Sequence, residues 1–242
     1  MDVNVKLLAK ICEAAGAPGF ESRVRKIVIE EVKDFVDEIE VDNLGNVYAI
    51  KKGKDSSKRA MVGAHMDEIG FIVKHIDENG FLRFNNLGGF DPKTLTAQRV
   101  IVHGKKDVLG VMGSKPIHIM SADEKNKKLE LSDFFIDLGL PAEEVNELIS
   151  IGNPVTRERK LVEMGKCVNC KSIDNRVAVY ILIETLKNMK TPDYDVYGVF
   201  TVQEEIGIRG ASVAAHNINP DFGFGLDTTC LLYTSDAADE AK

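Results

Sequence analysis

The chain has 242 residues, of which 44% are hydrophobic and 29% charged, and a formal net charge of -7. This length suits one large or two small domains, and the composition excludes a disordered chain. The negative charge and the lack of a dense Lys/Arg cluster argue against nucleic acid as a partner. No apolar run approaches the roughly 20 residues of a membrane span, so no membrane partner is expected. The first residues lack the pattern of a signal peptide, so we expect a cytoplasmic location.

Four cysteines are spread along the chain: Cys12, Cys167, Cys170 and Cys230. Only Cys167 and Cys170 have a spacing that suggests metal ligands, and a structural zinc site needs a second such pair. We therefore expect reduced thiols with a structural role.

Two helices are predicted at the start of the chain. Apolar side chains recur at helical spacing through residues 3–15, and Gly16-Ala17-Pro18-Gly19 then ends this helix. A second helix is predicted up to Asp34, with Ser22 as its N-cap.

Strands follow these helices. Residues 39–41 and 47–50 flank Asn43-Leu44-Gly45-Asn46, which is typical of a hairpin. The polar residues 51–58 are predicted as an exposed loop, and the apolar residues 60–64 as a short buried strand.

From about residue 70 to residue 156 the pattern changes to short alternating strands, separated by turns such as Asn79-Gly80 and Gly88-Gly89. This segment is predicted as a small β domain with one short helix over residues 141–150. After Cys170 the α/β pattern returns, with helices predicted over 175–188 and 209–216 and strands over 199–205 and 222–226.

These elements predict an α/β fold, with a mixed sheet, helices on both faces and an inserted β-rich domain. The expected parts are 1–69 and 161–229 for the α/β domain and 70–160 for the insertion. Residues 230–242 resemble a translated sequencing adaptor, and we interpret them as an artefact.

Two adjacent carboxylates, Glu204 and Glu205, end the apolar run that begins at Val199. Burying unpaired carboxylates is costly, so they are normally matched by cations or metal ions. Neighbouring residues on a strand point to opposite sides, which predicts different roles for the two glutamates. One would hold a metal while the other takes a proton from water.

Three further motifs also follow short apolar segments: His65-Met66-Asp67, Asp174 and Asp227. Each has a simple structural explanation when taken alone. His65 could be an isolated histidine, Asp174 a carboxylate favoured by a helix N-terminus, and Asp227 an ordinary strand-to-loop aspartate. The other histidines are interpreted as structural or surface residues: His75, His103, His118 and His216.

Taken together, these motifs resemble the M42 family of dinuclear metallo-aminopeptidases. The resemblance runs from Val5 to about Thr229 and includes Gly16-Ala17-Pro18-Gly19-Phe20-Glu21. Its motifs are Ala64-His65-Met66-Asp67-Glu68-Ile69-Gly70, Lys171-Ser172-Ile173-Asp174-Asn175-Arg176, Gln203-Glu204-Glu205-Ile206-Gly207-Ile208-Arg209-Gly210-Ala211 and Gly225-Leu226-Asp227-Thr228.

The resemblance implies a role for each site residue. His65, Asp174 and Asp227 would bind one metal, and Asp174 would bridge to a second metal held by Glu205. Glu204 would be the general base toward a water bridged by the two metals. Asp67 would orient His65.

The resemblance also implies two divalent ions per subunit, zinc or cobalt, and peptide substrates with a free N-terminus. Members of the family assemble through the inserted domain into dimers and then a dodecamer, so a homo-oligomer is expected. The family's second metal has one more histidine ligand near the C-terminus, in a stretch absent from this sequence. We therefore expect weak activity from these 242 residues alone.

Three alternatives remain. A related dinuclear amidohydrolase, such as a deacylase or carboxypeptidase, would use the same core on different substrates. An assembly fragment without activity would leave the intact ligand set unexplained. A two-carboxylate glycosidase is less favoured, because its carboxylates must face one sugar from separated positions.

Overall fold

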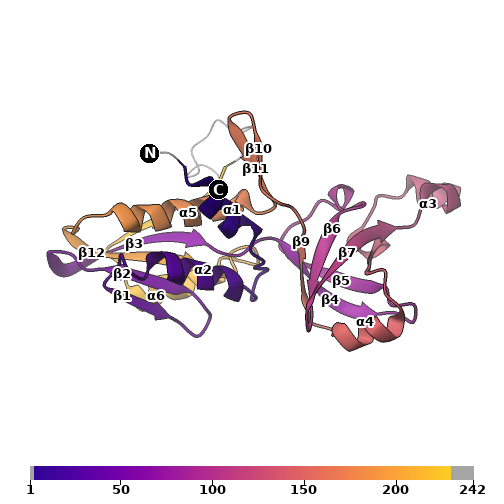
Figure 1. The fold of residues 1–242 in the computed structure, drawn as a ribbon, viewed down its shortest axis with the longest axis horizontal. Helices are drawn as coiled ribbons and strands as arrows, with labels where there is room; N and C mark the ends of the chain where they lie inside the picture. Colours follow the sequence, from indigo (N-terminus) through magenta and orange to yellow (C-terminus); the bar gives the residue numbers. More distant parts are fainter. Residues whose placement is uncertain (1–2, 230–242) are drawn as a thin grey trace.

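The computed structural model describes residues 3–229, which form two parts along the long axis of the molecule (Figure 1). One part is a five-stranded sheet with helices on both faces, and the other contains a closed six-stranded barrel. The predicted α/β fold with a β-rich insertion is confirmed. The boundaries at 69 and 160 remain predictions, and residues 230–242 lie outside the described residues.

The sheet is mixed. Its strands, in spatial order, are β1 (Glu38–Val41), β2 (Val47–Lys51), β12 (Tyr194–Thr201), β3 (Asp55–His65) and β13 (Phe222–Gly225). Strands β12, β3 and β13 run parallel, whereas β1 and β2 pair antiparallel as the predicted hairpin. Three strands therefore end at the same edge of the sheet.

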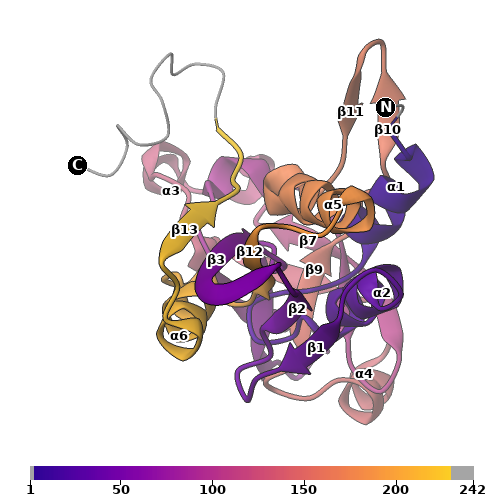
Figure 2. The same cartoon turned by 90° about the vertical axis from the view of Figure 1, so that its left-hand side faces the viewer.

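Helices cover both faces of the sheet (Figure 2). One face is covered by α1 (Val5–Glu13), α2 (Ser22–Val32) and α5 (Ile173–Asn188), and the other by α6 (Arg209–Ile218). Strand β2 shows why both faces are buried. Val47 and Ala49 pack in the core under the first three helices, while Tyr48 and Ile50 pack in the core under α6. Successive strand residues point to opposite faces, so β2 supplies both cores.

The barrel encloses the second large core. Its strands, in order, are β4 (Gly70–Ile76), β5 (Leu82–Leu87), β8 (Phe134–Asp137), β7 (Asp107–Ser114), β6 (Arg99–His103) and β9 (Pro154–Arg157). The side chains of Phe71, Val102 and Ile136 have no exposed surface, and Val145 of α4 (Ala142–Leu148) packs against them. Pairing of β9 with β4 and β6 closes the barrel, so no edge strand is left open.

Short elements complete the described chain. The connections carry η1 (Pro92–Thr94), η2 (Ile117–Ile119), α3 (Ala122–Asn126) and η3 (Leu131–Asp133), and β10 (Val162–Met164) pairs with β11 (Cys167–Asn169) as a hairpin. The two parts are linked by Arg23 of α2, whose guanidinium donates to both carboxylate oxygens of Asp107 at 2.6 and 2.7 Å. His103 contacts the same carboxylate at 2.8 Å, so it has a structural partner in the barrel.

The first two helices both start differently from the predictions, and α1 begins at Val5 instead of residue 3. Asn4 caps α1, because its side-chain oxygen accepts a hydrogen bond from the Leu7 N–H. The prediction that Ser22 is an N-cap is wrong. Glu21 occupies that position and its carboxylate accepts the Gly19 N–H at 2.7 Å, which leaves Ser22 as the first helical residue.

Two predicted strand limits are also wrong. Strand β3 begins at Asp55, within the expected loop. The first residues of β3 are exposed, and they join the sheet by backbone pairing with β12 instead of by burying apolar side chains. Strand β12 ends at Thr201, so Glu204 and Glu205 are not strand residues. Gln203 adopts a left-handed conformation with φ of 55°, which turns the chain away from the sheet.

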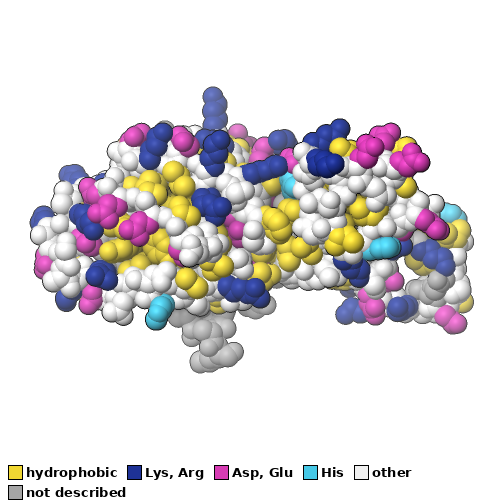
Figure 3. Space-filling model, turned by 90° about the horizontal axis from the view of Figure 1, so that it is seen from below, with side chains coloured by type: hydrophobic (Ala, Val, Ile, Leu, Met, Phe, Trp, Pro, Cys, Tyr) yellow, Lys and Arg dark blue, Asp and Glu magenta, His cyan; other side chains and the backbone are white. Residues whose placement is uncertain are grey.

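The surface is charged with both signs. On the face shown in Figure 3, acidic and basic side chains are interspersed among hydrophobic ones over both parts of the molecule. None of the helices in residues 3–229 has the length and apolar content that a bilayer-spanning segment requires. Cys12, Cys167 and Cys170 are free thiols, as predicted.

Candidate metal centre

The predicted site residues gather where the parallel strands end. His65 is the last residue of β3 and is paired with Thr201, the last residue of β12. Beyond β13, Leu226 still donates its N–H to the Gly63 carbonyl at 2.9 Å, which places Asp227 at the same edge. Ligands of open α/β sheets bind at the carboxyl ends of strands, so this edge is the expected position for a site.

His65 is at the centre of this group. Its side chain is only 3% exposed, and its Nε2 atom lies 3.3 Å from Oδ1 of Asp174. The same nitrogen lies 3.8 Å from Oε2 of Glu204 and 4.0 Å from Oδ1 of Asp227. Three carboxylates therefore converge on one imidazole nitrogen.

Asp67 lies behind the imidazole and is fully buried. Its Oδ1 atom is 3.5 Å from Nδ1 of His65, which also lies 3.2 Å from the Asp67 carbonyl oxygen. The carboxylate accepts the backbone N–H groups of Glu204 and Glu205, each at 3.0 Å. Asp67 thus contacts His65 on one side and holds the glutamate loop on the other.

The two glutamates belong to a compact turn. The Glu204 carbonyl accepts the N–H groups of Gly207 and Ile208, both at 2.9 Å. The expectation that Glu204 and Glu205 point to opposite sides is wrong, because it assumed a strand. In this turn the Glu204 carboxylate approaches His65, and Glu205 also offers an oxygen within 4.8 Å of a His65 ring nitrogen.

Asp174 and Asp227 reach the site from exposed positions, with side chains 64% and 52% exposed. Asp174 lies in the first turn of α5, where it and Asn175 depart from helical geometry. Asn175 donates its side-chain amide to the Leu226 carbonyl at 2.8 Å. This bond ties the start of α5 to the segment that carries Asp227.

The charges at the site are unbalanced. Burial and the nearby charge of Asp174 together raise the pKa of Glu205 to about 7. Burial also raises the pKa of Glu204. Burial would lower the pKa of His65, but its contacts with Asp174 and Asp67 outweigh burial and raise it to about 10. Protons are retained because the carboxylates outnumber the cations beside them.

This ligand set fits a divalent cation. His65, Asp174 and Glu205 each offer one ligand atom, and these atoms lie within 4.8 Å of one another. Mixed imidazole and carboxylate ligands suit zinc and cobalt, and a cation would also compensate the surplus negative charge. The contact between Asp67 and Nδ1 leaves Nε2 of His65 facing the other ligands, the usual arrangement for a metal-binding histidine.

A buried ion cluster behind the site was not predicted. Glu68 is 1% exposed and contacts the ammonium of Lys171, while Nη2 of Arg176 lies 3.7 Å from the same carboxylate oxygen. Arg176 has no exposed surface and donates to the Ile11 carbonyl at 2.7 Å. The cluster fixes the segment after Asp67 against the segment around Asp174. The only sequence signal was the presence of opposite charges in the two site motifs.

Glu21 was also not assigned a role. Its buried carboxylate accepts the N–H of Gln203 at 3.2 Å as well as that of Gly19. It therefore supports the left-handed turn that redirects the chain before Glu204. Its position after a Gly/Pro turn was a signal, but nothing in the sequence linked it to residue 203.

A hollow of about 420 Å³ opens beside the site. Three of the converging residues line it, namely His65, Glu204 and Asp227. Most of the remaining wall is apolar and includes Ile208 and Phe224. The hollow can accept an organic group next to the carboxylates.

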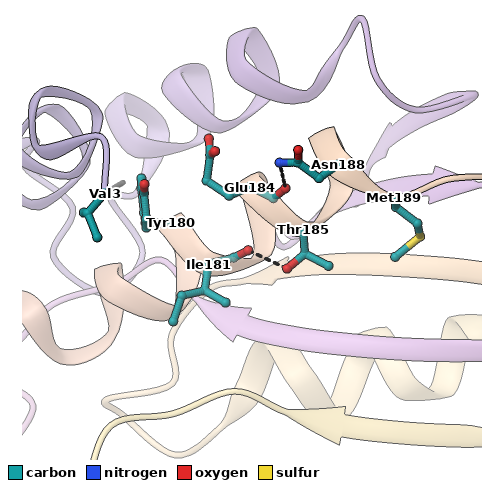
Figure 4. Close-up of a pocket in the computed structure, with 7 residues that line it drawn as sticks. All are labelled: Val3, Tyr180, Ile181, Glu184, Thr185, Asn188 and Met189. Carbon is teal, nitrogen blue, oxygen red and sulfur yellow. Dashed lines mark hydrogen bonds between the residues drawn. The ribbon is translucent and has the colours of Figure 1, made fainter. Parts of the chain in front are cut away.

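A second hollow, of about 500 Å³, lies along α5 near Val3 (Figure 4). Thr185 and Asn188 donate to carbonyls one turn earlier in their own helix, and the Tyr180 hydroxyl accepts the Asn4 N–H at 2.9 Å. It contains no predicted site residue, and only Glu184 contributes a carboxylate. The chemistry therefore belongs to the sheet edge and not to this helix face.

Comparison with known proteins bears on this site. The family model described as M42 glutamyl aminopeptidase matches residues 45–242. A putative aminopeptidase of Acetivibrio thermocellus is 42% identical over 92% of this chain and 65% of its own length. The lysyl aminopeptidase of Pyrococcus furiosus is 36% identical, over 94% of this chain and 67% of its own length. This chain thus spans about two thirds of the length of these relatives.

A solved structure has the same fold. The TET1 peptidase of Pyrococcus horikoshii, described as able to assemble into a tetrahedron or a large octahedral shell, superposes with a TM-score of 0.86. The match is 32% identical and covers 96% of this chain and 72% of that one.

Proposed function

Because this chain belongs to the M42 glutamyl aminopeptidase family, we propose that its whole protein removes N-terminal residues from peptides by metal-assisted hydrolysis. The observation that carries the proposal is the convergence of Asp174, Glu204 and Glu205 on the buried imidazole of His65. A related dinuclear deacylase or carboxypeptidase is the alternative, because it would need the same ligands.

We propose that His65, Asp174, Glu205 and Asp227 would hold two divalent ions, with Asp174 a ligand of both. Divalent ions such as zinc or cobalt supply Lewis acidity toward water and a peptide carbonyl. Asp67 is the residue that holds the His65 imidazole in orientation through Nδ1. The 4.0 Å between Nε2 and Asp227 supports Asp227 as a further ligand of the ion that His65 binds.

We assign Glu204 as the general base. Its carboxylate is partly buried, with a raised pKa, and lies beside the ligand group instead of within it. A base with a raised pKa can take a proton from the attacking water and return it to the leaving amine near neutral pH. The backbone bond from Glu204 to Asp67 keeps this carboxylate in reach.

We infer that the substrate is a peptide with a free N-terminus. The hollow beside Glu204 and Asp227 can accept an apolar side chain, and the surplus of carboxylates favours an ammonium group near them. The fold shared with the TET1 peptidase, described as able to assemble into a tetrahedron or a large octahedral shell, supports a homo-oligomer for this protein. Light scattering on the purified protein tests the oligomer.

Two matched variants test the assignment in the full-length protein: Glu204→Gln and Glu205→Gln. Glu204→Gln should lower turnover of an aminoacyl anilide by about 10² to 10⁴ and leave the metal content unchanged. Glu205→Gln should lower both turnover and metal content. Metal loss in Glu204→Gln would make Glu204 a ligand and reverse the two roles.

The substrate class is tested with the wild-type protein. An aminoacyl anilide with a free amino group should be cleaved, whereas its N-acetylated form should not. Preferential cleavage of the acetylated form would favour the deacylase. Release of C-terminal residues from a peptide would favour the carboxypeptidase.

A further inference from the structure

The barrel reaches the candidate metal centre through the loop that follows β5. Gly88, the first residue of this loop, lies beside Ile69 and beside Glu205 of the glutamate turn. A Cβ atom at Gly88 would lie 3.3 Å from Cβ of Glu205 and 2.6 Å from Cγ2 of Ile69. Real Cβ atoms essentially never come closer than 3.0 Å to another heavy atom. A side chain at this position would therefore force the loop, Ile69 or Glu205 to shift.

The two glycines of this loop differ. Gly88 has φ of 91°, a backbone conformation that suits glycine. A Cβ atom at Gly89 would meet nothing within 4 Å. The sequence marked Gly88-Gly89 only as a turn between strands, whereas the structure shows that the first glycine makes the contact with the metal centre.

The loop is held to the barrel on both sides of Gly88. Asn86 donates its side-chain amide to the Gly88 carbonyl at 2.6 Å. Phe90 stacks on Phe71 of β4, with the ring centroids 4.2 Å apart. The position of Gly88 is thus set by the barrel.

The loop is also tied to the part of the molecule that contains the mixed sheet. The guanidinium of Arg157 in β9 lies over the Phe90 ring, 5.8 Å from its centroid. The same guanidinium donates to the Lys171 carbonyl at 2.6 Å. Lys171 lies just ahead of Asp174, so the loop cannot easily move away from the site.

The residues on the other side of the contact are held as well. Ile69 follows Asp67 and Glu68, which are both buried, and Glu68 pairs with Lys171. The β-branched side chain of Ile69 has little rotational freedom. A displacement at Gly88 would therefore be passed on to Glu205.

We propose that Gly88 is a positioning residue of the metal centre, through which the barrel sets the position of Glu205. This inference rests on the proposed function, in which Glu205 is a metal ligand. The contact at Cβ of Glu205 limits where its carboxylate can go. Groups that support a metal ligand in this way typically contribute about 10- to 100-fold to metal affinity.

Gly88→Ala and Gly152→Ala in the full-length protein test the proposal. Gly152 lies ahead of β9 with φ of 92°, and a Cβ atom there would meet nothing within 4 Å. The control thus imposes the same backbone strain without the contact. Zinc affinity, measured by competition with a chelator, should fall about 10- to 100-fold in Gly88→Ala and stay unchanged in Gly152→Ala. Unchanged affinity in Gly88→Ala, or equal losses in both variants, would overturn the proposal.

The visible spectrum of the cobalt-loaded protein gives a readout that a general loss of stability does not move. Its bands depend on the geometry of the ligands. Gly88→Ala should shift these bands, and Gly152→Ala should leave them as in the wild type. A wild-type spectrum in Gly88→Ala would show that Gly88 does not position a ligand.

Asn86→Ala decides the question if Gly88→Ala does not fold. Asn86 is exposed, so its truncation should leave the fold intact, but it removes the bond that holds the Gly88 carbonyl. Zinc affinity should fall by less than in Gly88→Ala. Wild-type affinity in Asn86→Ala would then overturn the proposal.

Glu205→Gln separates this inference from the proposed function. If Glu205→Gln loses zinc while Gly88→Ala retains it, the role of Gly88 is wrong and Glu205 remains a ligand. If Glu205→Gln retains zinc with wild-type affinity, the ligand assignment is wrong and the inference fails with it.

Discussion

The backbone N–H of Glu204 donates a 3.0 Å hydrogen bond to Oδ1 of Asp67, although the two residues are 137 positions apart in the chain. The other oxygen of Asp67 accepts the N–H of Glu205 at the same distance. One buried carboxylate therefore sets the position of both glutamates. The same side chain contacts the His65 imidazole and positions Glu204, the proposed general base.

Asp67→Asn should affect both functions of this carboxylate. The amide keeps one acceptor oxygen but turns an NH₂ group toward a backbone N–H or toward His65. Loss of such a supporting group typically lowers metal affinity or activity by about 10- to 100-fold. Metal titration and turnover measure the two effects separately, and unchanged values for both would show that Asp67 has only a packing role.

The logarithm of the metal affinity should rise with pH, and the slope of this rise should change near neutrality. Without metal, the pKa of His65 is raised to about 10 and that of Glu205 to about 7, so a metal ion must displace protons from both. The logarithm of the affinity should rise by about two per pH unit below pH 7 and by about one above it. Titration of the metal-free protein from pH 6 to pH 8 measures this slope.

Glu205→Gln is the control for that slope, because the amide carries no titrating proton. The metal affinity of this variant should be lower, and the logarithm of that affinity should rise by about one per pH unit from pH 6 to pH 8. A slope of two that survives in this variant would assign the second proton to another group.

Arg176→Met should destabilise the fold strongly. The change leaves Glu68 buried with Lys171 as its remaining ion-pair partner, and breaking a buried ion pair typically costs about 3–5 kcal/mol in the free energy of unfolding. Lys160→Met is the control, since the Lys160–Glu13 pair is exposed and such pairs contribute about 0–1 kcal/mol. Urea unfolding measures both, and equal costs would contradict the role of the buried cluster.

Gly210→Ala should destabilise the turn that carries the glutamates. A Cβ atom at Gly210 would meet the backbone of Val202, with its nitrogen 2.6 Å away, and the side chain of Asn46. Such overpacking typically costs about 1–3 kcal/mol. Gly223→Ala in β13 is the control, because a Cβ there meets nothing within 4 Å and should change stability by less than about 1 kcal/mol. Thermal unfolding of both variants compares them.

The sequence predicted the architecture better than the detail of the site. Periodic apolar residues located the helices and strands, because burial of one or both faces leaves a local pattern. The end of β12 left no such pattern. Gln203 turns left-handed where Glu21 and Asp67 accept the backbone N–H groups of residues 203–205, and both acceptors are distant in sequence.

Bonding partners that are distant in sequence also explain the errors at Ser22 and at the start of β3. Ser22 has a strong N-cap propensity, but Glu21 occupies the cap, and its carboxylate accepts the N–H of the distant residue Gln203 as well as that of nearby Gly19. Asp55 begins a strand without an apolar pattern because its partner strand supplies the pairing. Each error concerns a backbone bond whose partner cannot be read from neighbouring residues.

The parallel pairing of β3 with β12 also affects how the protein reaches its native state. The barrel strands from Gly70 to Arg157 lie between these two strands in the chain, and each barrel pairing uses residues within that interval. Pairings across long intervals form slowly, since the entropy of closing the loop is lost before the contacts repay it. The barrel should therefore acquire protection from hydrogen exchange before the central sheet does, and the edge that carries His65 should be among the last regions to become ordered.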